Sequence, residues 1–455
     1  MDIPALVSRQ REYFLGGATL EPSERKESLL RLQKAILARE KEIAEALHAD
    51  MRKSPFESYM SETGMVLDEL RYIAKHLEKW AKPKRVPTPL SQFPSRSFIC
   101  KEPYGVTLVM SPWNYPFLLS LDPLIGSIAA GNCVILKPSA YAPHTSHLLA
   151  DLISSVFSPA HVAVVEGGRE ENSSLLEQRF DFIFFTGSVS VGKLVMEKAA
   201  QNLTPVVLEL GGKSPCIIDE TANLPMAARR LVFGKLLNAG QTCVAPDYVL
   251  VKRERKEDLI SLLKSNIQDA LGQNPGKNPE FPKIINQKHF QRLCAILEGE
   301  TILLGGETDE AALTIAPTVT EASAESPSMQ EEIFGPILPI LTYDKPDDAI
   351  RFIQEREKPL ALYLFTESKA FEKRILQEVS FGGGCINDTI IHLATHHMPF
   401  GGVGHSGMGS YHGKKSFDAF THEKSIVKKS SSVDLPVRYH PYTEKKLKML
   451  KKFLK

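Results

Sequence analysis

The 455-residue chain has little cysteine, almost no net charge and no long hydrophobic run. Its six cysteines form no Cys-x-x-Cys pair, and six in this length is no disulfide framework, so reduced thiols are expected. The 55 basic and 54 acidic residues leave a net charge of +1. That balance gives no electrostatic drive toward a polyanion, so we expect no nucleic-acid partner.

Two further absences bear on location. The longest uncharged run, Pro103–Leu121, contains Pro103, Pro112 and Pro116, so it cannot form one transmembrane helix. Met1–Pro4 lacks the basic and apolar regions of a secretory signal. Together they predict a cytoplasmic protein. The chain length predicts roughly two or three domains.

What the sequence does contain, from Gly105 on, is an alternation of short apolar runs and helical segments. Short apolar runs between helices indicate a parallel sheet covered on both faces, hence an α/β fold with two domains joined near Glu209–Gly212. The predicted strands are Val106–Met110, Cys133–Leu136, Val162–Val165, Phe182–Phe185, Pro215–Ile218, Tyr248–Lys252 and Leu360–Phe365. The predicted helices are Ser23–Asp50, Ser61–Trp80, Phe117–Ala130, Thr145–Phe157, Asn172–Gln178, Met226–Asn238, Glu257–Leu271 and Pro346–Glu355.

Two segments lie outside this alternation. Lys82–Pro94 carries four prolines, which predicts an extended connector or arm. Thr443–Lys455 is basic and amphipathic, with leucines on one side. We expect a terminal helix docked on its own domain, and the alternative is a weak contact with a membrane surface.

The stretch Gly240–Asp247, between a predicted helix and a predicted strand, contains Cys243. Gly240 permits close backbone approach or a positive φ, and Pro246 interrupts regular hydrogen bonding just past the cysteine. A cysteine at such a junction is either a nucleophile or a buried apolar residue.

A carboxylate elsewhere in the sequence favours the nucleophile over the buried apolar cysteine. Glu209 ends the apolar run Val206–Leu208 and precedes a Gly-Gly turn, so burial without a partner would raise its pKa. The alternative is a structural glutamate paired with Lys213. A thiol and a strained carboxylate in one chain suggest covalent catalysis with a positioned base.

A nucleotide site is suggested by Phe182–Lys193, which reads as a strand, a glycine turn and a helix start. Gly187, Ser188 and Gly192 would place backbone N–H groups where a phosphate can bind, although the spacing fits neither the usual dinucleotide fingerprint nor a P-loop. Lys137 ends another strand, where it would face the ligand crevice of an open sheet. The alternative is an ordinary surface lysine.

Asn114 lies between Trp113 and Tyr115 after the strand Val106–Met110, and its amide is of the kind that stabilises an oxyanion. The alternative is a packed aromatic loop. Gly402–Gly407 matches G-x-G-x-x-G, but no apolar strand precedes it, so we reject it as a nucleotide loop. His396-His397 lacks a third ligand at a suitable spacing, so no metal site is predicted.

With these residues in view, the chain resembles the aldehyde dehydrogenase superfamily, and most closely its class 3, fatty and aromatic aldehyde branch. The resemblance runs from about Tyr13 to Phe420. Its most specific segments are Leu208–Pro215, Gly240–Cys243, Glu331–Pro336 and Pro399–Gly402.

The resemblance implies NAD(P)-dependent oxidation of aldehydes, with catalytic roles for three residues. Cys243 would be the nucleophile that forms a thiohemiacetal and then a thioester. Asn114 would help to form the oxyanion hole, and Glu209 would be the base that activates water.

The resemblance also implies cofactor contacts. Lys137 would reach the adenosine ribose of NAD or NADP, and Gly187, Ser188 and Gly192 would line the pyrophosphate turn. Glu332 would hold the nicotinamide ribose, with Phe334 close by. Many NAD-preferring relatives carry a glutamate after the Lys-Pro-Ser run, where this chain has Ala140, so we expect NADP to be accepted at least as well as NAD.

The expected organisation is a Rossmann-like cofactor domain, an α/β catalytic domain and a small β oligomerisation arm that supports a homodimer. The expected boundaries are 1–81 and 101–209 for the cofactor domain, 210–400 for the catalytic domain, 82–100 and 401–430 for the arm, and 431–455 for the basic tail.

Three other functions remain open at this point. A CoA-acylating aldehyde dehydrogenase would pass the thioester to CoA, but it would have little use for Glu209. A protein that keeps the fold without catalysis would have no need of Cys243, Glu209 and Asn114. A cysteine hydrolase would need a histidine near Cys243, and none is close in the sequence.

Overall fold

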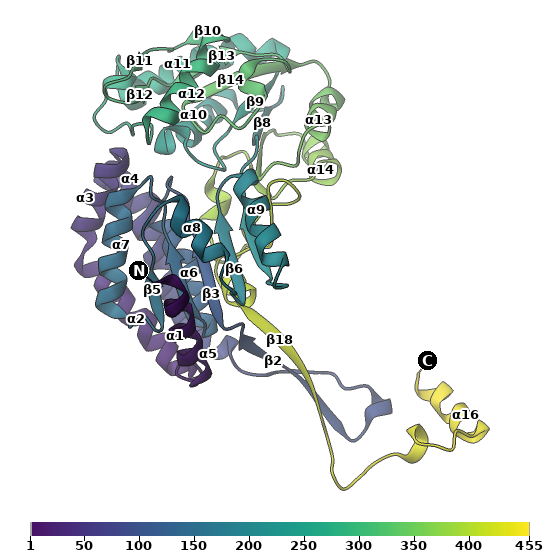
Figure 1. Cartoon of the computed structure of the whole chain (residues 1–455). Coiled ribbons are helices and arrows are strands. Elements are labelled where there is room, and N and C mark those ends of the chain that lie inside the picture. The colour runs from purple at the N-terminus through teal and green to yellow at the C-terminus, as the bar shows by residue number, and fades with distance from the viewer. Residues whose placement is uncertain (1, 455) are drawn as a thin grey trace.

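The computed structural model describes residues 2–454, which form two α/β bodies and a long arm (Figure 1). The first body is built on a six-stranded sheet in the order β17-β7-β6-β3-β4-β5. All neighbouring strands are parallel except β17, which runs antiparallel to β7. The strands are β3 (Val106–Met110), β4 (Cys133–Lys137), β5 (Val162–Val164), β6 (Phe182–Thr186), β7 (Val206–Glu209) and β17 (Gly407–Met408).

Helices cover both faces of this sheet because its central strands bury both of their sides. Leu108 and Met110 of β3 pack in one hydrophobic cluster and Val109 packs in another, which follows the two-residue period of a strand. The helices of this body are α1 (Ile3–Leu15), α2 (Pro22–Ala38), α3 (Glu40–Met51), α4 (Pro55–Ser58), α5 (Gly64–Trp80), α6 (Leu118–Ala130), α7 (Pro143–Val156), α8 (Arg169–Leu176), α9 (Val189–Ala200) and α15 (Lys414–Ala419).

The second body holds a seven-stranded sheet in the order β10-β13-β14-β9-β8-β15-β16, parallel except at β10. Its strands are β8 (Pro215–Ile218), β9 (Tyr248–Lys252), β10 (Thr301–Leu304), β13 (Thr318–Glu321), β14 (Ile337–Tyr343), β15 (Ala361–Phe365) and β16 (Gly383–Ile386), with a separate hairpin of β11 (Thr308–Asp309) and β12 (Thr314–Ile315). Its helices are α10 (Leu224–Leu236), α11 (Lys256–Leu271), α12 (Gln287–Glu298), α13 (Pro346–Gln354) and α14 (Lys369–Glu378). The expected α/β class with parallel sheets is confirmed.

The arm is a three-stranded antiparallel sheet that projects from the first body (Figure 1). It consists of β1 (Lys84–Val86), β2 (Ser95–Pro103) and β18 (Thr421–Lys429). The segment expected to belong wholly to the arm, 401–430, also supplies β17 and α15 to the first body. The assignment of functions to these units stays a prediction.

Three sequence expectations need correction. The predicted helix Ser23–Asp50 is two helices, because Arg39 leaves the helical region (φ −117°, ψ 18°) and its N–H bonds to the carbonyl of Ile36. The predicted helix Ser61–Trp80 begins with a π-helical turn, Tyr59–Thr63. The terminal helix α16 (Glu444–Phe453) does not dock on a body: it lies beyond the arm and packs near Leu90 at the arm's tip (Figure 1).

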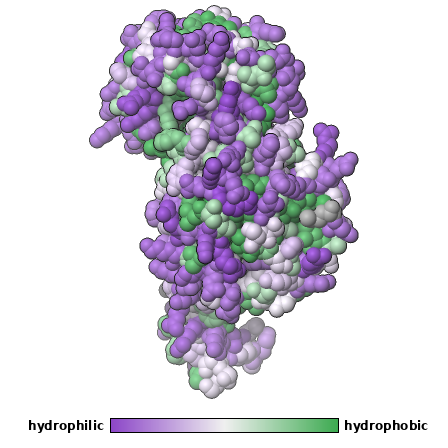
Figure 2. Space-filling model, turned by 90° about the vertical axis from the view of Figure 1, so that its left-hand side faces the viewer, coloured by the Kyte–Doolittle hydropathy of each residue, from purple (hydrophilic) through white to green (hydrophobic). Residues whose placement is uncertain are grey.

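On the face shown in Figure 2, hydrophilic residues cover most of the surface and hydrophobic residues form smaller patches between them. Within residues 2–454, none of the helices has both the length and the apolar character needed to cross a membrane.

Candidate active site

The candidate residues from the first half of the chain meet at one edge of the first sheet. If the five parallel strands are numbered 1 to 5 in chain order, from β3 to β7, their order across the sheet is 3-2-1-4-5. The strand order therefore reverses between β3 and β6, and open parallel sheets bind ligands at such a point. Asn114 follows β3, Lys137 ends β4, Gly187 follows β6, and Glu209 ends β7. The Gly187 N–H donates to the Glu209 carbonyl (3.0 Å), so the glycine turn and the carboxylate strand are adjacent.

Cys243 follows a strained turn. Asn238, Ala239 and Gly240 all have left-handed backbones, with φ of 52°, 52° and 72°. Two of them are not glycine, and such residues persist in this region only when their surroundings hold them. The predicted helix Met226–Asn238 therefore ends earlier, at Leu236.

Side-chain amides hold this turn. The Gln241 amide donates to the carbonyls of Asn238 (3.1 Å) and Lys283 (3.0 Å) and accepts from the Ile285 N–H (3.0 Å). The Asn238 N–H donates to the Glu57 carboxylate (2.7 Å). These contacts fix the backbone just before Cys243 in a conformation that it would not adopt alone.

Asn114 lies against the same turn. Its side chain is 2% exposed, and its amide nitrogen donates to the Gln241 carbonyl (3.1 Å). An amide nitrogen carries two hydrogens, so this contact leaves one that can donate to a ligand. The structure thus brings Asn114 and the Cys243 turn together from two different bodies.

Cys243 is a partly buried ionisable group, and Glu209 is a fully buried one. Burial, with smaller contributions from the charges of Glu332 and Glu209, raises the pKa of the Cys243 thiol to about 12. Burial raises the pKa of Glu209, which is 2% exposed, well above its ordinary value. Neither carboxylate oxygen of Glu209 has a hydrogen-bond partner within residues 2–454. A buried carboxylate that accepts no hydrogen bonds is a strong base when it is ionised.

The alternative of a Glu209–Lys213 pair is wrong. The Lys213 ammonium instead forms an ion pair with Asp247 and donates to the carbonyls of Ser328 (2.6 Å) and Glu331 (2.9 Å). Asp247 in turn accepts from the Ile333 N–H (2.9 Å). Lys213, between β7 and β8, therefore holds the loop before β14 next to Asp247 at the start of β9, and it leaves Glu209 without a counter-ion.

That loop carries the other two predicted cofactor contacts. The carboxylate of Glu332 lies so close to Gly211 that a side chain at this position would displace it. Burial and the charge of Asp247 raise the pKa of Glu332 to about 8. Phe334 has a left-handed backbone (φ 52°) and meets the Trp113 ring edge-on, with 5.4 Å between ring centres. Glu332 thus lies near Cys243, whose pKa its charge affects.

The residues predicted to hold the adenosine end and the pyrophosphate fit a dinucleotide. Ser188 caps α9 by accepting from the Val191 N–H (3.5 Å), so a 12-residue helix begins at the ligand edge of the sheet. A side chain at Gly192 would meet Leu210, so the glycine lets α9 pack close to β7. A helix N-terminus on a glycine turn is a binding site for a pyrophosphate.

Lys137 is buried at this edge of the sheet, so the alternative of an ordinary surface lysine is wrong. Its ammonium donates to the carbonyls of Pro138 and Gly167 (2.7 Å each), and burial lowers its pKa to about 8.

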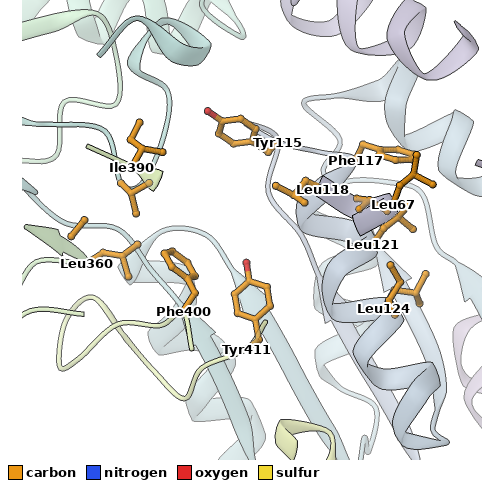
Figure 3. Packing of buried hydrophobic residues seen from close by; sticks show 14 of the residues in the cluster. Leu67, Tyr115, Phe117, Leu118, Leu121, Leu124, Leu360, Ile390, Phe400 and Tyr411 are labelled. Atoms are coloured by element: carbon orange, nitrogen blue, oxygen red, sulfur yellow. The ribbon is translucent and has the colours of Figure 1, made fainter. Parts of the chain in front are cut away.

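An apolar pocket of about 240 Å³ opens on Cys243. Tyr115, Ile390, Phe400 and Tyr411 surround this space from several loops, and Leu118 of α6 borders it (Figure 3). The Tyr115 hydroxyl lies 2.7 Å from that of Thr242, beside the cysteine. No sequence signal predicted that the segment 390–412 contributes to this pocket.

A buried ion pair behind Asn114 had no signal in the sequence. Lys53 and Glu62 are fully buried, with 2.5 Å between ammonium and carboxylate. The Lys53 ammonium also donates to the Asn114 carbonyl (3.1 Å) and lies 4.0 Å from the centre of the Tyr115 ring. Glu62 accepts from the Phe117 N–H (2.9 Å) at the start of α6. The π-helical turn that contains Glu62 had no clear sequence signal, and such turns often mark functional sites.

Breaking the Lys53–Glu62 ion pair should destabilise the folded protein. Lys53→Met leaves the Glu62 charge buried and unpaired, so we expect the free energy of unfolding to fall by about 3 to 5 kcal/mol in a denaturant titration. The double variant Lys53→Met/Glu62→Gln removes the charge and keeps an acceptor for α6, so it should recover most of that loss. Arg71→Met, which breaks a solvent-exposed pair with Asp68, should cost less than about 1 kcal/mol. A loss no larger than that of Arg71→Met would contradict the structural role of Lys53.

The rejected G-x-G-x-x-G segment has another place in the fold. Gly407 and Met408 form β17 against β7, and the Ser406 carbonyl accepts from the Leu210 N–H (3.1 Å). The segment therefore closes the sheet edge next to Glu209, without opening a helix there. Among the described residues there is no group of three or more His, Cys, Asp or Glu side chains arranged to hold a metal ion.

Comparisons with known proteins agree with this geometry. The model of the aldehyde dehydrogenase family matches residues 1–426. The chain is 49% identical to the 4,4'-diaponeurosporen-aldehyde dehydrogenase of Staphylococcus aureus, covering 98% of this chain and 97% of that protein. It is 45% identical to aldehyde dehydrogenase family 3 member A2 of Pongo abelii, over 98% and 93% of the two chains.

Solved structures are similar as well. The substrate-bound state of Staphylococcus aureus AldH superposes with a TM-score of 0.98, at 48% identity and over all of both chains. The Mycobacterium tuberculosis aldehyde dehydrogenase complexed with NAD+ has a TM-score of 0.85 at 28% identity, covering 95% of this chain and 91% of that chain.

Proposed function

Because the chain belongs to the aldehyde dehydrogenase family, whose members are NAD(P)-dependent oxidoreductases, we propose that it oxidises aliphatic aldehydes of medium or long chain, or aromatic aldehydes, to carboxylic acids. One observation carries the proposal: Cys243 lines an apolar pocket, and the pKa of its thiol is raised in part by the charge of Glu209, whose carboxylate has no hydrogen-bond partner within residues 2–454. A nucleophile that lines an apolar pocket, with a base close to it, suits covalent aldehyde chemistry.

In the first step, the Cys243 sulfur attacks the aldehyde carbon, and the electron pair of the carbonyl double bond moves onto the aldehyde oxygen to form a thiohemiacetal. The thiol, with a pKa of about 12, is protonated at neutral pH and must pass its proton to solvent water as the bond forms. The negative charge on the aldehyde oxygen would be stabilised by the Asn114 amide and the backbone N–H of Cys243. One such donor is typically worth about 3 kcal/mol.

NAD or NADP, when bound, supplies the acceptor for the hydride that leaves the aldehyde carbon. Lys137 would hold the adenosine ribose, and Glu332 and Phe334 would position the nicotinamide ribose. Gly187, Ser188 and Gly192 would bind the pyrophosphate through the turn and the start of α9.

Loss of the hydride leaves a thioester on Cys243, which water must hydrolyse. Glu209 would take a proton from that water, because it is buried and no other group holds its oxygens. Its raised pKa makes the ionised form a better base than an exposed carboxylate.

The proposal is tested by mixing the protein with hexanal or benzaldehyde and following the absorbance of the reduced cofactor. We expect turnover with both aldehydes, since the pocket walls are apolar. Absence of turnover that is restored by added CoA would replace the proposed water with CoA as the acyl acceptor.

Cofactor choice gives a further prediction. Ala140 is exposed just after Lys137–Ser139, so no carboxylate at this position repels the 2′-phosphate of NADP. We expect kcat/KM with NADP to be at least equal to that with NAD. Ala140→Glu should lower kcat/KM for NADP by roughly tenfold or more, through like-charge repulsion, and change the value for NAD less. Strict dependence of the wild type on NAD in steady-state kinetics would overturn this prediction.

Assembly and location also stay predictions. We propose a homodimer joined through the arm, because the nine-residue strand β18 forms one edge of the arm sheet and an open edge invites pairing. The exposed Leu447 and Leu454 and the neighbouring lysines of the tail suit a weak membrane-surface contact. The cytoplasmic location expected from the sequence is untested.

A further inference from the structure

A second cavity, of about 330 Å³, lies beside the apolar pocket. The two cavities share a wall, which consists of Met60, Met65, Leu393, Ala394 and His412. The other walls of the second cavity are polar, and we call it the acidic side pocket after three of its residues, Asp68, Glu69 and Asp122. It is therefore placed where a substituent on a substrate could reach it.

Asp122 is the residue that indicates a ligand-binding site here. It is 3% exposed, and its Oδ1 atom has no hydrogen-bond partner within residues 2–454. The nearest basic group, His412 Nε2, lies 3.9 Å from the other oxygen, and burial lowers the pKa of His412 to about 4, so this ring is neutral. A buried acceptor without a donor destabilises the protein, and a donor on a ligand would relieve this.

Glu69 is the second buried carboxyl group of the side pocket. It is 6% exposed, and its Oε1 atom accepts from the Gly413 N–H (2.6 Å). Its Oε2 atom lies 3.8 Å from His396 Nδ1, which is beyond hydrogen-bond distance. Burial raises the pKa of Glu69 to about 7. Gly413 and Ser416 already form hydrogen bonds with Glu69, so Asp122 supplies the unpartnered acceptor of the side pocket.

These groups suit a hydroxyl better than a cation. Burial and the nearby Glu69 raise the pKa of Asp122 well above its ordinary value, so the pocket does not hold two fixed negative charges. The one exposed carboxylate, Asp68, already has Arg71 3.4 Å away. Moving an ammonium group through the apolar pocket would also cost far more than moving a hydroxyl.

We propose that the acidic side pocket binds a hydroxyl group carried by the aldehyde substrate, which donates to Asp122 Oδ1; this inference rests on the proposed function. The aldehyde end reaches Cys243, the carbon chain lies in the apolar pocket, and the distal hydroxyl passes His412 into the side pocket. The substrate class is thus extended to aldehydes that carry an alcohol away from the reacting carbon.

The test compares n-alkanals, starting at hexanal, with the matching ω-hydroxyalkanals on the wild type, Asp122→Leu and Asp122→Asn. For the best hydroxyalkanal of the series, Asp122→Leu should lower kcat/KM by roughly 10- to 100-fold, as expected for one lost hydrogen bond to a buried group, and change the value for the matching alkanal less than about threefold. Asp122→Asn keeps an acceptor and should stay within about threefold of wild type. Asp68→Asn is the matched control and should change kcat/KM for neither substrate.

A measurement on the wild type covers the case in which Asp122→Leu does not fold. An alkane-α,ω-diol should inhibit alkanal oxidation at least about fivefold more strongly than the primary alcohol of the same length. Equal inhibition by the two, an equal loss for both substrates in Asp122→Leu, or a preference for ω-ammonio aldehydes would overturn the inference while alkanal oxidation stands. If the wild type does not oxidise alkanals at all, the proposed function fails and the inference fails with it.

Discussion

Cys243→Ala is expected to lower kcat for hexanal oxidation by on the order of 10⁵-fold, the size of loss seen when a covalent nucleophile is removed. The reason is that Cys243 lines the apolar pocket, and the strained turn Asn238–Gly240 holds it there. Asn114 and Glu209 remain, but neither can form the covalent bond to the aldehyde carbon. Steady-state absorbance of the reduced cofactor measures the loss.

Cys294→Ala is the matched control for this variant. Cys294 is another partly exposed thiol of the second body, on α12, and it lies outside the pocket lining. Its replacement should leave kcat within about twofold of wild type, as expected for a change away from the site. Comparable activity in Cys243→Ala and wild type would remove Cys243 from the reaction.

Glu209→Gln should separate the two halves of the reaction. We expect steady-state kcat to fall by roughly 10²- to 10⁴-fold, the usual contribution of a general base, because thioester hydrolysis loses its proton acceptor. The first turnover should survive: the charge of Glu209 helps to raise the pKa of the Cys243 thiol, so a neutral glutamine does not hinder thiolate formation. Rapid mixing should therefore show a burst of about one reduced cofactor per active site, followed by slow turnover.

The control for this variant is Glu197→Gln on the exposed face of α9, which should behave as wild type. A Glu209→Gln enzyme with no burst would place Glu209 before the hydride step. An enzyme with unchanged kcat would show that another group activates the water.

The fold was predictable where the sequence pattern is local. The strands Val106–Met110, Pro215–Ile218 and Tyr248–Lys252 have the predicted bounds, because each is a short apolar run between turn residues and is buried on both faces. The helix break at Arg39 was not predictable, since no proline or glycine marks it and the apolar spacing continues across it. Helix α16 was misplaced for a related reason: its amphipathic pattern shows that it has an apolar face and does not show what covers that face.

The residues of the candidate site could also be predicted only in part from the sequence. The sequence brought together Cys243, Glu209 and Asn114 as residue types with a shared chemistry, and the structure places Asn114 against the turn before Cys243. The pairing of Glu209 with Lys213 was wrong because the geometry after β7 directs the lysine to Asp247. The Lys53–Glu62 pair and the acidic side pocket depend on contacts between residues distant in sequence, and their spacing in the chain carries no signal.

The most direct test of the account is the intact mass of Glu209→Gln after incubation with hexanal and NAD or NADP, followed by peptide mapping. The account predicts that the protein gains the mass of one hexanoyl group, attached to Cys243 as a thioester, and that hydroxylamine removes it. Active protein that turns over hexanal without ever carrying an acyl group, or that carries it on another residue, would contradict covalent catalysis by Cys243.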